Sequence, residues 1–187
     1  CFDYVYKDIK EDILLGSISG GTDIISCFAL SSPLLPVIRG ELQCRGLGMD
    51  VYAYDQNQNS LIGEKGELVC CTAFPSMPIY FWNDPDGTKY KKAYFETFKG
   101  IWHHGDLISI SKTGGVKIYG RSDTTLNPGG VRIGTAEIYR VLSSLSYIED
   151  SLVVGQKWKT DQRIILFVQL KNNAVLGQNL INELKAQ

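Results

Sequence analysis

The spacing of hydrophobic side chains changes along the chain and predicts a different kind of element in each part. A first helix is indicated near the start by apolar residues on one face, namely Phe2, Val5, Tyr6 and Ile9. The apolar run at residues 13–18 then predicts a buried strand. Over residues 33–116 the apolar runs are short and separated by turn-forming clusters, which predicts a small antiparallel sheet or distorted barrel at about residues 36–119.

The last part of the chain has the pattern of a small lobe of helices and strands. Two strand-like runs, at residues 150–155 and 163–170, lie between two stretches in which apolar residues have helical spacing. Those residues are Ile138, Val141, Leu142 and Leu145 before the strands, and Leu176, Leu180, Ile181 and Leu184 after them. The order helix, strand, strand, helix follows a β-rich part, so the α+β fold class is predicted.

A tight turn and a helix start lie between these two parts, within residues 120–142. Pro128 fixes φ for the second position of a turn and Gly129 can adopt the positive φ of the third, so a type II-like turn between short strands is expected. Thr135 is the expected N-cap of the following helix. Glu137 falls in the first turn, where the helix dipole favours a carboxylate, and this explains it more simply than a catalytic role.

Three ionisable side chains flank this turn: Arg121, Asp123 and Arg132. Stiff local structure on both sides would hold them more firmly than a linker would, which is typical of a binding site or of a joint between domains. Simpler interpretations stay open, with Asp123 closing an Asx turn and Arg132 lying on the surface of a strand.

Composition and charge narrow the classes of partner. With 187 residues, 44% of them hydrophobic and 21% charged, the chain has the material for one globular domain or two small ones. The net charge is -1 and no run of basic residues exceeds Lys91-Lys92, so neither a nucleic acid nor a membrane is expected as a partner. No stretch reaches the roughly 18 apolar residues of a membrane helix. The chain lacks an initial Met and a cap before its first helix, which predicts a fragment of a longer protein.

The cysteines favour a reducing environment. Their number, five, is odd, and the pair Cys70-Cys71 lies in an apolar run, so a disulfide framework is not expected and a cytoplasmic location is predicted. The histidines are the neighbours His103 and His104, and no Cys-x-x-Cys spacing occurs, which gives a zinc site little support. His104 is expected to be a packing or surface residue.

Candidate chemistry begins where the first predicted strand ends. Gly20 and Gly21 are followed there by Thr22 and Asp23, and a strand that ends in glycines and a hydroxyl is typical of a sheet edge that binds an anion. A plain turn from strand to loop explains the same residues equally well. Asp106, in a Gly-Asp pair, is a second candidate carboxylate that is also interpretable as a turn residue.

The order of these residues along the chain is more informative than any one of them. A hydroxyl and a carboxylate after a strand are followed by Gly-Asp, by Gly-Arg-x-Asp and by Gly-x-Arg before a helix-opening Glu. This pattern resembles the adenylate-forming superfamily of acyl-CoA synthetases, luciferases and peptide-synthetase adenylation domains, and it is most similar to the acetoacetate-activating ligases. The matching motifs cover nearly the whole chain: Ser-Ile-Ser-Gly-Gly-Thr-Asp-Ile at 17–24, Arg-Gly-Leu-Gly-Met at 45–49, Gly-Glu-Leu-Val-Cys at 66–70, Tyr-Phe-Trp-Asn-Asp at 80–84, Trp-His-His-Gly-Asp at 102–106 and Gly-Arg-Ser-Asp-Thr-Thr-Leu-Asn-Pro at 120–128.

The resemblance implies that ATP or AMP, Mg²⁺ and coenzyme A are the ligands. Thr22 would contact the α-phosphate. Asp23, in the place of the superfamily's usual Glu, would help to hold Mg²⁺, which fits the preference of that ion for carboxylate oxygens. Both residues are thereby assigned to the catalytic centre, and Gly20 and Gly21 to the nucleotide-binding loop around them.

Further roles are implied for the ribose, the hinge and the CoA path. Asp106 would accept both ribose hydroxyls, and Arg121 would donate to the ribose or the phosphate. Asp123 matches the hinge position about which the small C-terminal domain turns between adenylation and thioester formation. Arg132 matches a residue near the phosphate and the CoA tunnel, and Gly130 would let the pantetheine pass close to the backbone.

The resemblance also implies a division of the chain and an activity. Residues 1–122 would be the C-terminal part of the large AMP-binding domain, and residues 123–187 an incomplete mobile domain. The parent enzyme would activate acetoacetate, or a similar short acid, with ATP and pass the acyl group to CoA, releasing AMP and pyrophosphate. The superfamily's phosphate loop, adenine-binding segment and catalytic lysine are expected outside residues 1–187, so the chain alone is expected to be inactive.

Two alternative functions stay open: an acetyl-, propionyl- or medium-chain acyl-CoA synthetase, and a non-catalytic β-rich binding module. Acetate-using relatives carry Trp where Gly20 stands, so the missing indole would leave room for a longer acyl group. The sequence does not indicate the oligomeric state.

Overall fold

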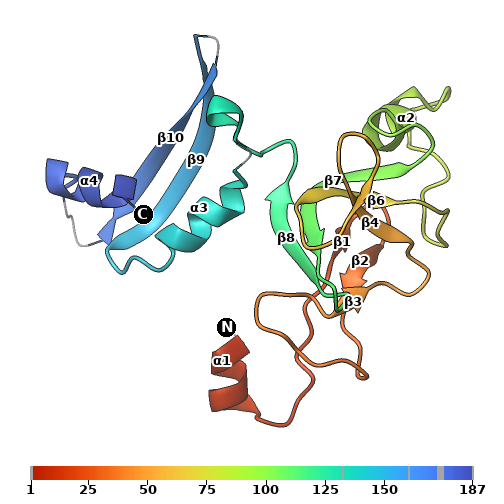
Figure 1. Cartoon of the computed structure of the whole chain (residues 1–187), viewed down its shortest axis with the longest axis horizontal. Coiled ribbons are helices and arrows are strands. Elements are labelled where there is room, and N and C mark those ends of the chain that lie inside the picture. The colour runs from red at the N-terminus through yellow and green to blue at the C-terminus, as the bar shows by residue number, and fades with distance from the viewer. Residues whose placement is uncertain (1, 132, 160, 172–174, 187) are drawn as a thin grey trace. The chain divides into compact units, whose positions relative to one another are not determined.

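Antiparallel strand pairs and a few short helices form the chain, so the predicted α+β fold class is confirmed (Figure 1). The computed structural model describes residues 2–131, 133–159, 161–171 and 175–186. It divides into two units, Cys1–Ile118 and Tyr119–Gln187. Within the described residues, no helix combines the length and the apolar character needed to cross a membrane.

The first unit contains two sheets and a helix, after a short helical start at α1 (Phe2–Tyr4) and η1 (Val5–Ile9). One sheet has the strand order β1-β2-β3 and the other the order β5-β4-β6-β7-β8. The strands are β1 (Ser19–Gly21), β2 (Ser26–Leu30), β3 (Cys44–Arg45), β4 (Val51–Tyr54), β5 (Ser60–Leu61), β6 (Gly66–Cys70), β7 (Trp102–Ile110) and β8 (Val116–Arg121). The last three residues of β8 already belong to the second unit. The small antiparallel sheet predicted for the middle of the chain is therefore present.

The core of the first unit is centred on Trp102 of β7, whose side chain is 1% exposed. Its ring centroid lies 5.3 Å from that of Phe74, 6.4 Å from that of Phe28 and 3.7 Å from that of Tyr94. These aromatic contacts join β2, the loop after β6 and the helix before β7 to one strand. Pairs of this kind add to the stabilisation that burial of their area already provides.

The prediction of a strand at residues 13–18 is wrong. The segment has no regular structure, and Ile13, Leu14 and Ile18 are 42%, 47% and 67% exposed. The first strand begins at Ser19, where the chain pairs with β2. An apolar run becomes a buried strand only beside a strand that shares its hydrogen bonds, and no strand of the described residues pairs with this segment.

The sequence alone predicts no definite state for the aromatic segment that forms α2 (Thr88–Phe95). Asp84, which is 6% exposed, starts this helix. Its Oδ1 accepts the N–H of Lys89 and its Oδ2 the N–H of Tyr90, both at 2.9 Å. N–H groups of a first helical turn have no partner inside the helix, so a carboxylate at this place stabilises the start. The helix then turns Tyr90 and Tyr94 toward Trp102.

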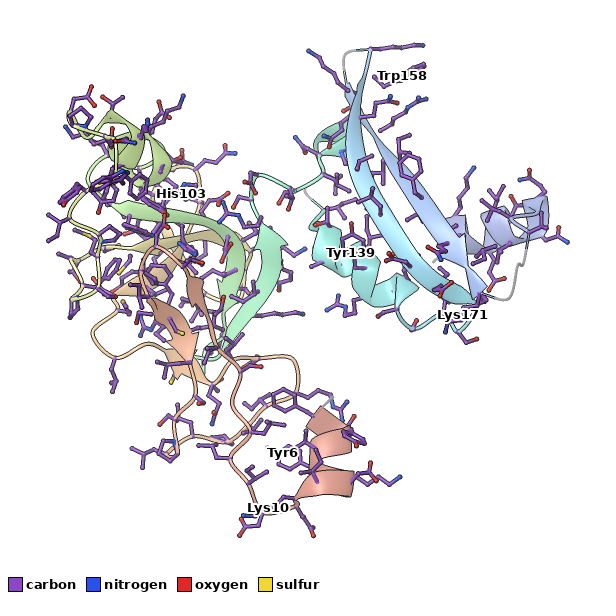
Figure 2. All side chains as sticks on the ribbon, turned by 180° about the vertical axis from the view of Figure 1, so that it is seen from behind. Tyr6, Lys10, His103, Tyr139, Trp158 and Lys171 are labelled. Carbon is purple, nitrogen blue, oxygen red and sulfur yellow. The ribbon has the colours of Figure 1, made fainter. Side chains whose placement is uncertain are left out.

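The second unit has the predicted order helix, strand, strand, helix. Its elements are η2 (Pro128–Gly130), α3 (Thr135–Leu142), β9 (Ile148–Trp158), β10 (Asp161–Leu170) and α4 (Gln178–Ala186). The strands β9 and β10 form an antiparallel hairpin, and its core includes Leu142 and Val153. The hydroxyl of Tyr139 accepts the N–H of Val153 at 3.0 Å, which attaches α3 to β9 (Figure 2).

In the turn before α3, Gly129 has the predicted positive φ, 59°. The residues of the turn are shifted by one position from the prediction. The N–H of Val131 donates to the carbonyl oxygen of Pro128 at 3.1 Å, so Pro128 is the first residue of the turn and not the second. A bridge between Leu126 and Ile133 closes the expected short hairpin.

The cap of α3 is Gly134 and not Thr135 as predicted. The N–H of Gly134 donates to Oε1 of Glu137 at 3.2 Å, and its carbonyl oxygen accepts the N–H of Glu137 at 2.9 Å. A Cβ atom at Gly134 would lie 2.6 Å from the carbonyl oxygen of Tyr119, so close packing favours a glycine at this cap. Glu137 is thus a carboxylate that caps the start of the helix, which agrees with the simpler interpretation given from the sequence.

Removal of the Asp84 carboxylate is expected to destabilise the first unit through α2. Asp84→Ala leaves two N–H groups of the first turn without their acceptor, and the expected loss in the free energy of unfolding is about 1–2 kcal/mol. Asp86→Ala, which removes an exposed carboxylate bonded to the N–H of Thr88, is the control and should lose less. Urea unfolding followed by circular dichroism measures both variants. An equal loss in the two would contradict the role given to Asp84.

Candidate functional site

Thr22 and Asp23 occupy the turn of the β1–β2 hairpin. Gly21 pairs with Ser26 at the end of the two strands, and the N–H of Ile25 donates to the carbonyl oxygen of Thr22 at 3.2 Å. Both Thr22 and Asp23 are exposed. The hairpin therefore presents a hydroxyl and a carboxylate side by side to a ligand that approaches the end of the strands.

A β-bulge in β7 positions the second group of candidate residues. Glu67 and Val69 of β6 pair with Leu107 and His103, so Leu68 alone faces three residues of β7. Those three residues are His104, Gly105 and Asp106. The glycine has a φ of 80°, which residues with a side chain rarely adopt. Bulges redirect side chains out of the regular pleat and often do so beside active sites.

His104 and Asp106 are both 8% exposed, and Nε2 of His104 lies 3.9 Å from Oδ2 of Asp106. The indole N–H of Trp102 donates to Nδ1 of His104 at 3.4 Å. Because an indole N–H can only donate, Nδ1 is the unprotonated nitrogen and the imidazole is neutral. Nε2 then carries the proton and donates to the carbonyl oxygen of Gly20 at 3.3 Å. His104, expected to be a packing or surface residue, thus connects β7 to the β1–β2 hairpin.

Asp23 is joined to the same cluster through α2. The hydroxyl of Tyr94 donates to Oδ2 of Asp23 at 2.5 Å. The ring of Tyr94 stacks on Trp102, with centroids 3.7 Å apart and an angle of 14° between the planes. Sequence reasoning missed Tyr94, because it lies 71 positions from Asp23 and no local pattern identifies its helix.

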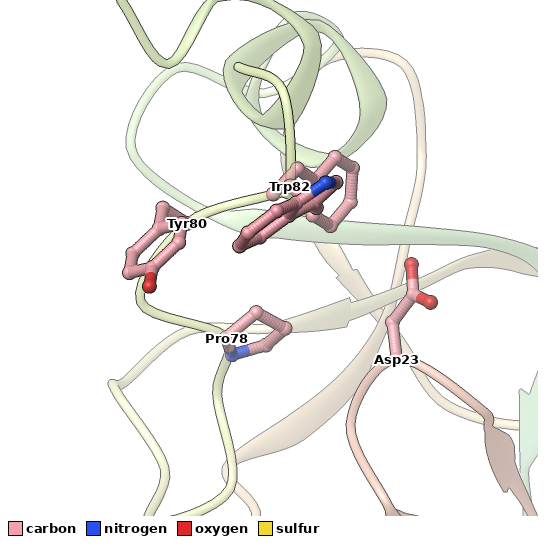
Figure 3. Close-up of a pocket in the computed structure, with 5 residues that line it drawn as sticks. Asp23, Pro78, Tyr80 and Trp82 are labelled. Carbon is pink, nitrogen blue, oxygen red and sulfur yellow. The ribbon is translucent and has the colours of Figure 1, made fainter. Parts of the chain in front are cut away.

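A pocket of 420 Å³ opens beside Asp23 (Figure 3). Its other walls come from the loop before α2 and are formed by Pro78, Tyr80, Phe81 and Trp82. Tyr80 and Trp82 are 67% and 83% exposed, so the pocket is an open aromatic recess with one carboxylate at its edge. Aromatic walls with few polar groups are typical of sites for small molecules.

A larger cavity of 780 Å³ lies within the second unit, between α3, β10 and α4. Its walls are mainly aliphatic, and Glu137 and Lys185 contribute the charged groups. No described residue of the predicted site lines this cavity. The polar cluster of the first unit is therefore the better candidate for chemistry.

Arg121 and Asp123 belong to the second unit and pair with each other. Nε of Arg121 lies 3.3 Å from Oδ1 of Asp123, and the two side chains are 50% and 66% exposed. The hydroxyls of Thr124 and Thr125 both donate to the carbonyl oxygen of Arg121, at 3.1 and 3.0 Å. These hydrogen bonds stiffen the turn that contains Asp123.

The predicted CoA-path residues follow this turn. Gly130 is the last residue of η2, and the preceding Gly129 donates its N–H to Oδ2 of Asp161 at 2.9 Å, which holds η2 to the start of β10. Arg132 lies outside the described residues.

Asp23 can offer one carboxylate oxygen to a divalent cation, because Tyr94 donates to the other. In the part of the chain that the structure describes, no three His, Cys, Asp or Glu side chains form a group that could hold a metal ion. Mg²⁺ commonly takes one or two protein carboxylates and completes its shell with substrate phosphates and water. The residues present therefore fit Mg²⁺ that binds together with a nucleotide.

Both glycines of the hairpin are required by close packing. A Cβ atom at Gly20 would overlap the carbonyl oxygen of Ser26 and lie 2.7 Å from Cα of Cys27. A Cβ atom at Gly21 would lie 2.7 Å from Cε1 of His104. A side chain at position 20 would therefore require the β1–β2 pairing to shift. The interpretation of Gly20 as room for a longer acyl group stays a prediction.

The two glycines are expected to differ in their tolerance of a methyl group. Gly20→Ala meets backbone atoms that cannot move aside and should lower the free energy of unfolding by about 2–3 kcal/mol. Gly21→Ala meets the His104 side chain, which can shift only by weakening its hydrogen bonds, and should lower it less, by about 1 kcal/mol. Gly177→Ala, where the new Cβ meets open space, is the control. Thermal unfolding of the three variants measures the order. A Gly20→Ala variant as stable as Gly177→Ala would refute the packing argument.

None of the models of known protein families matches the chain, whereas individual relatives do. The acetoacetyl-coenzyme A synthetase of Rhizobium meliloti is 53% identical over 184 residues, which cover 98% of this chain and 28% of that protein. The acetoacetyl-CoA synthetase of Gallus gallus is 48% identical over 98% of this chain and 28% of its own length. The solved structure of the acetoacetyl-CoA synthetase from Streptomyces lividans is similar with a TM-score of 0.82 at 47% identity, and the match covers 90% of this chain and 25% of that one.

The chain thus spans 28% of the length of the curated relatives that it matches. The similarity extends over nearly all of its residues in sequence and is repeated in the fold. The resemblance predicted from the motifs is therefore confirmed: over nearly its whole length the chain is similar to acetoacetyl-CoA synthetases in sequence and in fold.

Proposed function

We propose that this chain is part of an acid-CoA ligase that activates acetoacetate with ATP and transfers the acyl group to coenzyme A. The observation that carries the proposal is the 53% identity to an acetoacetyl-CoA synthetase over 98% of the chain. In the first step a carboxylate oxygen of the acid attacks the α-phosphorus of ATP and pyrophosphate leaves. In the second step the CoA thiol attacks the acyl carbon, and AMP leaves more readily than hydroxide would.

Thr22 and Asp23 are assigned to the reacting phosphate. The turn of the hairpin holds both side chains at its exposed end, where a phosphate can reach them. The Thr22 hydroxyl can donate to an oxygen of the α-phosphate. Mg²⁺, held in part by Asp23, would neutralise phosphate charge. Donors and charges that are already in place where negative charge develops lower the barrier of such a transfer.

Asp106 is assigned to the ribose. Its two carboxylate oxygens can accept hydrogen bonds from both hydroxyls of a vicinal diol. The bulge fixes it in a buried position beside the neutral imidazole of His104. Because His104 also donates to the carbonyl oxygen of Gly20, one side chain holds the ribose-binding strand and the phosphate-binding hairpin together. Gly20 and Gly21 allow this close approach.

Asp123 is assigned to the hinge of the mobile domain, with Arg121 donating to the ribose or the phosphate. Two observations support a joint here: the second unit begins at Tyr119, and β8 ends at Arg121. A single pivot between two stiff elements is what a domain rotation requires. Gly130 and Arg132 are assigned to the path of the pantetheine and the phosphates of CoA.

In the complete ligase, Asp106→Ala is expected to weaken the binding of an acyl-adenylate analogue by about tenfold or more, because two hydrogen bonds to a charged acceptor are lost. Isothermal titration calorimetry measures the dissociation constant. Asp86→Ala removes an exposed carboxylate from the same unit and should leave the affinity unchanged. Unchanged affinity in Asp106→Ala would favour a non-catalytic β-rich binding module instead.

The chain of 187 residues by itself is expected not to exchange labelled pyrophosphate into ATP in the presence of acetoacetate. The reason is that the superfamily's phosphate loop, adenine-binding segment and catalytic lysine are expected elsewhere in the ligase. Robust exchange by the chain alone would contradict the proposal. With the complete ligase, AMP release from acetate, propionate and acetoacetate in parallel identifies the preferred acid.

A further inference from the structure

We propose that Tyr94 is a positioning residue, which holds the Asp23 carboxylate in the orientation that the phosphate and its cation require. The inference rests on the role of Asp23 in the proposed function. Tyr94 donates its hydroxyl to Oδ2 of Asp23 at 2.5 Å. It acts through this hydrogen bond and not through contact with the substrate.

Asp23 needs such a partner because of where it lies. Its side chain is exposed in the turn of a hairpin, where a carboxylate can change rotamer freely when nothing selects one. The hydrogen bond from Tyr94 engages one oxygen, selects one orientation and leaves Oδ1 for a cation. Partners of this kind commonly orient metal-binding carboxylates, and their removal weakens binding without removing a ligand.

The hydroxyl of Tyr94 is itself held firmly. Its ring stacks on Trp102 at 3.7 Å and packs edge-on against Phe81 and Tyr90, with centroids 6.0 Å away in each case. Trp102 is fully buried and donates its N–H to His104. Phe81 also lines the pocket beside Asp23. The position of Asp23 is thereby connected to the core of the unit through a stack of rings.

Tyr90 provides a matched control on the same helix. It lies one turn before Tyr94, and its ring packs against Trp102 with centroids 6.2 Å apart. Its hydroxyl is buried and has no hydrogen-bond partner among the described residues. Burial raises the pKa of this hydroxyl, as expected for a phenol removed from water. Tyr90→Phe therefore removes the same atom as Tyr94→Phe without removing a hydrogen bond.

The test compares Tyr94→Phe and Tyr90→Phe in the complete ligase, with Mg·ATP as the probe. We expect Tyr94→Phe to raise the dissociation constant of Mg·ATP by about tenfold, as for the loss of a hydrogen bond to a charged group, with an unchanged midpoint of thermal unfolding. Tyr90→Phe should leave the dissociation constant unchanged and should not lower the midpoint. Calorimetry measures the affinity. Both variants keep the aromatic ring, so a difference in affinity between them does not come from a change in ring packing.

A double-mutant cycle decides whether Tyr94 acts through Asp23. Once Asp23→Ala has removed the carboxylate, Tyr94→Phe should weaken binding no further. Equal effects of the two Tyr→Phe changes, or a Tyr94→Phe effect that adds in full to that of Asp23→Ala, would overturn the proposal. Failure of the proposed function itself gives a different result. The unaltered ligase would then bind no Mg·ATP, and Asp106→Ala would have no effect on binding. Absence of Mg·ATP binding would overturn the role of Tyr94 as well.

Discussion

A fully buried indole must find an acceptor for its N–H, and for Trp102 that acceptor is Nδ1 of His104. This hydrogen bond determines the tautomer of the imidazole. It therefore directs the Nε2 proton to the carbonyl oxygen of Gly20 and keeps the ring beside Asp106. On its other side, the same indole stacks on Tyr94, which donates to Asp23. The core of the first unit thus sets the positions of the two carboxylates that we assign to the nucleotide.

The close packing around His104 also explains why glycines surround it. A side chain at Gly21 would meet the imidazole, and Gly105 takes a backbone conformation that a side chain disfavours. The Gly-Gly-Thr-Asp and Gly-Asp motifs therefore have a structural cause in addition to any contact with a ligand. Motifs of this kind combine residues that bind with residues that let two strands approach each other.

Local signals in the sequence are sufficient for the order of elements in the second unit, because turn residues and apolar spacing act over a few positions. Other features depend on distant partners. The helix α2 starts where the buried Asp84 accepts two N–H groups, and Tyr94 meets Asp23 across 71 positions. Residues 13–18 are apolar enough for a strand, but no described strand pairs with them. No periodicity within a short window reveals such partners.

Whether the turn at Asp123 can act as a hinge depends on the strength of the ion pair and the hydrogen bonds that hold it. The ion pair between Arg121 and Asp123 is exposed on both sides, so it contributes about 1 kcal/mol or less. The hydroxyls of Thr124 and Thr125 add two hydrogen bonds to one carbonyl oxygen, each worth about 1 kcal/mol. The strand β8 runs unbroken as far as Arg121, so the proposed hinge would bend in the residues after it. A few kcal/mol is enough to favour one state of a turn, and it is small enough for substrate binding to reverse that preference.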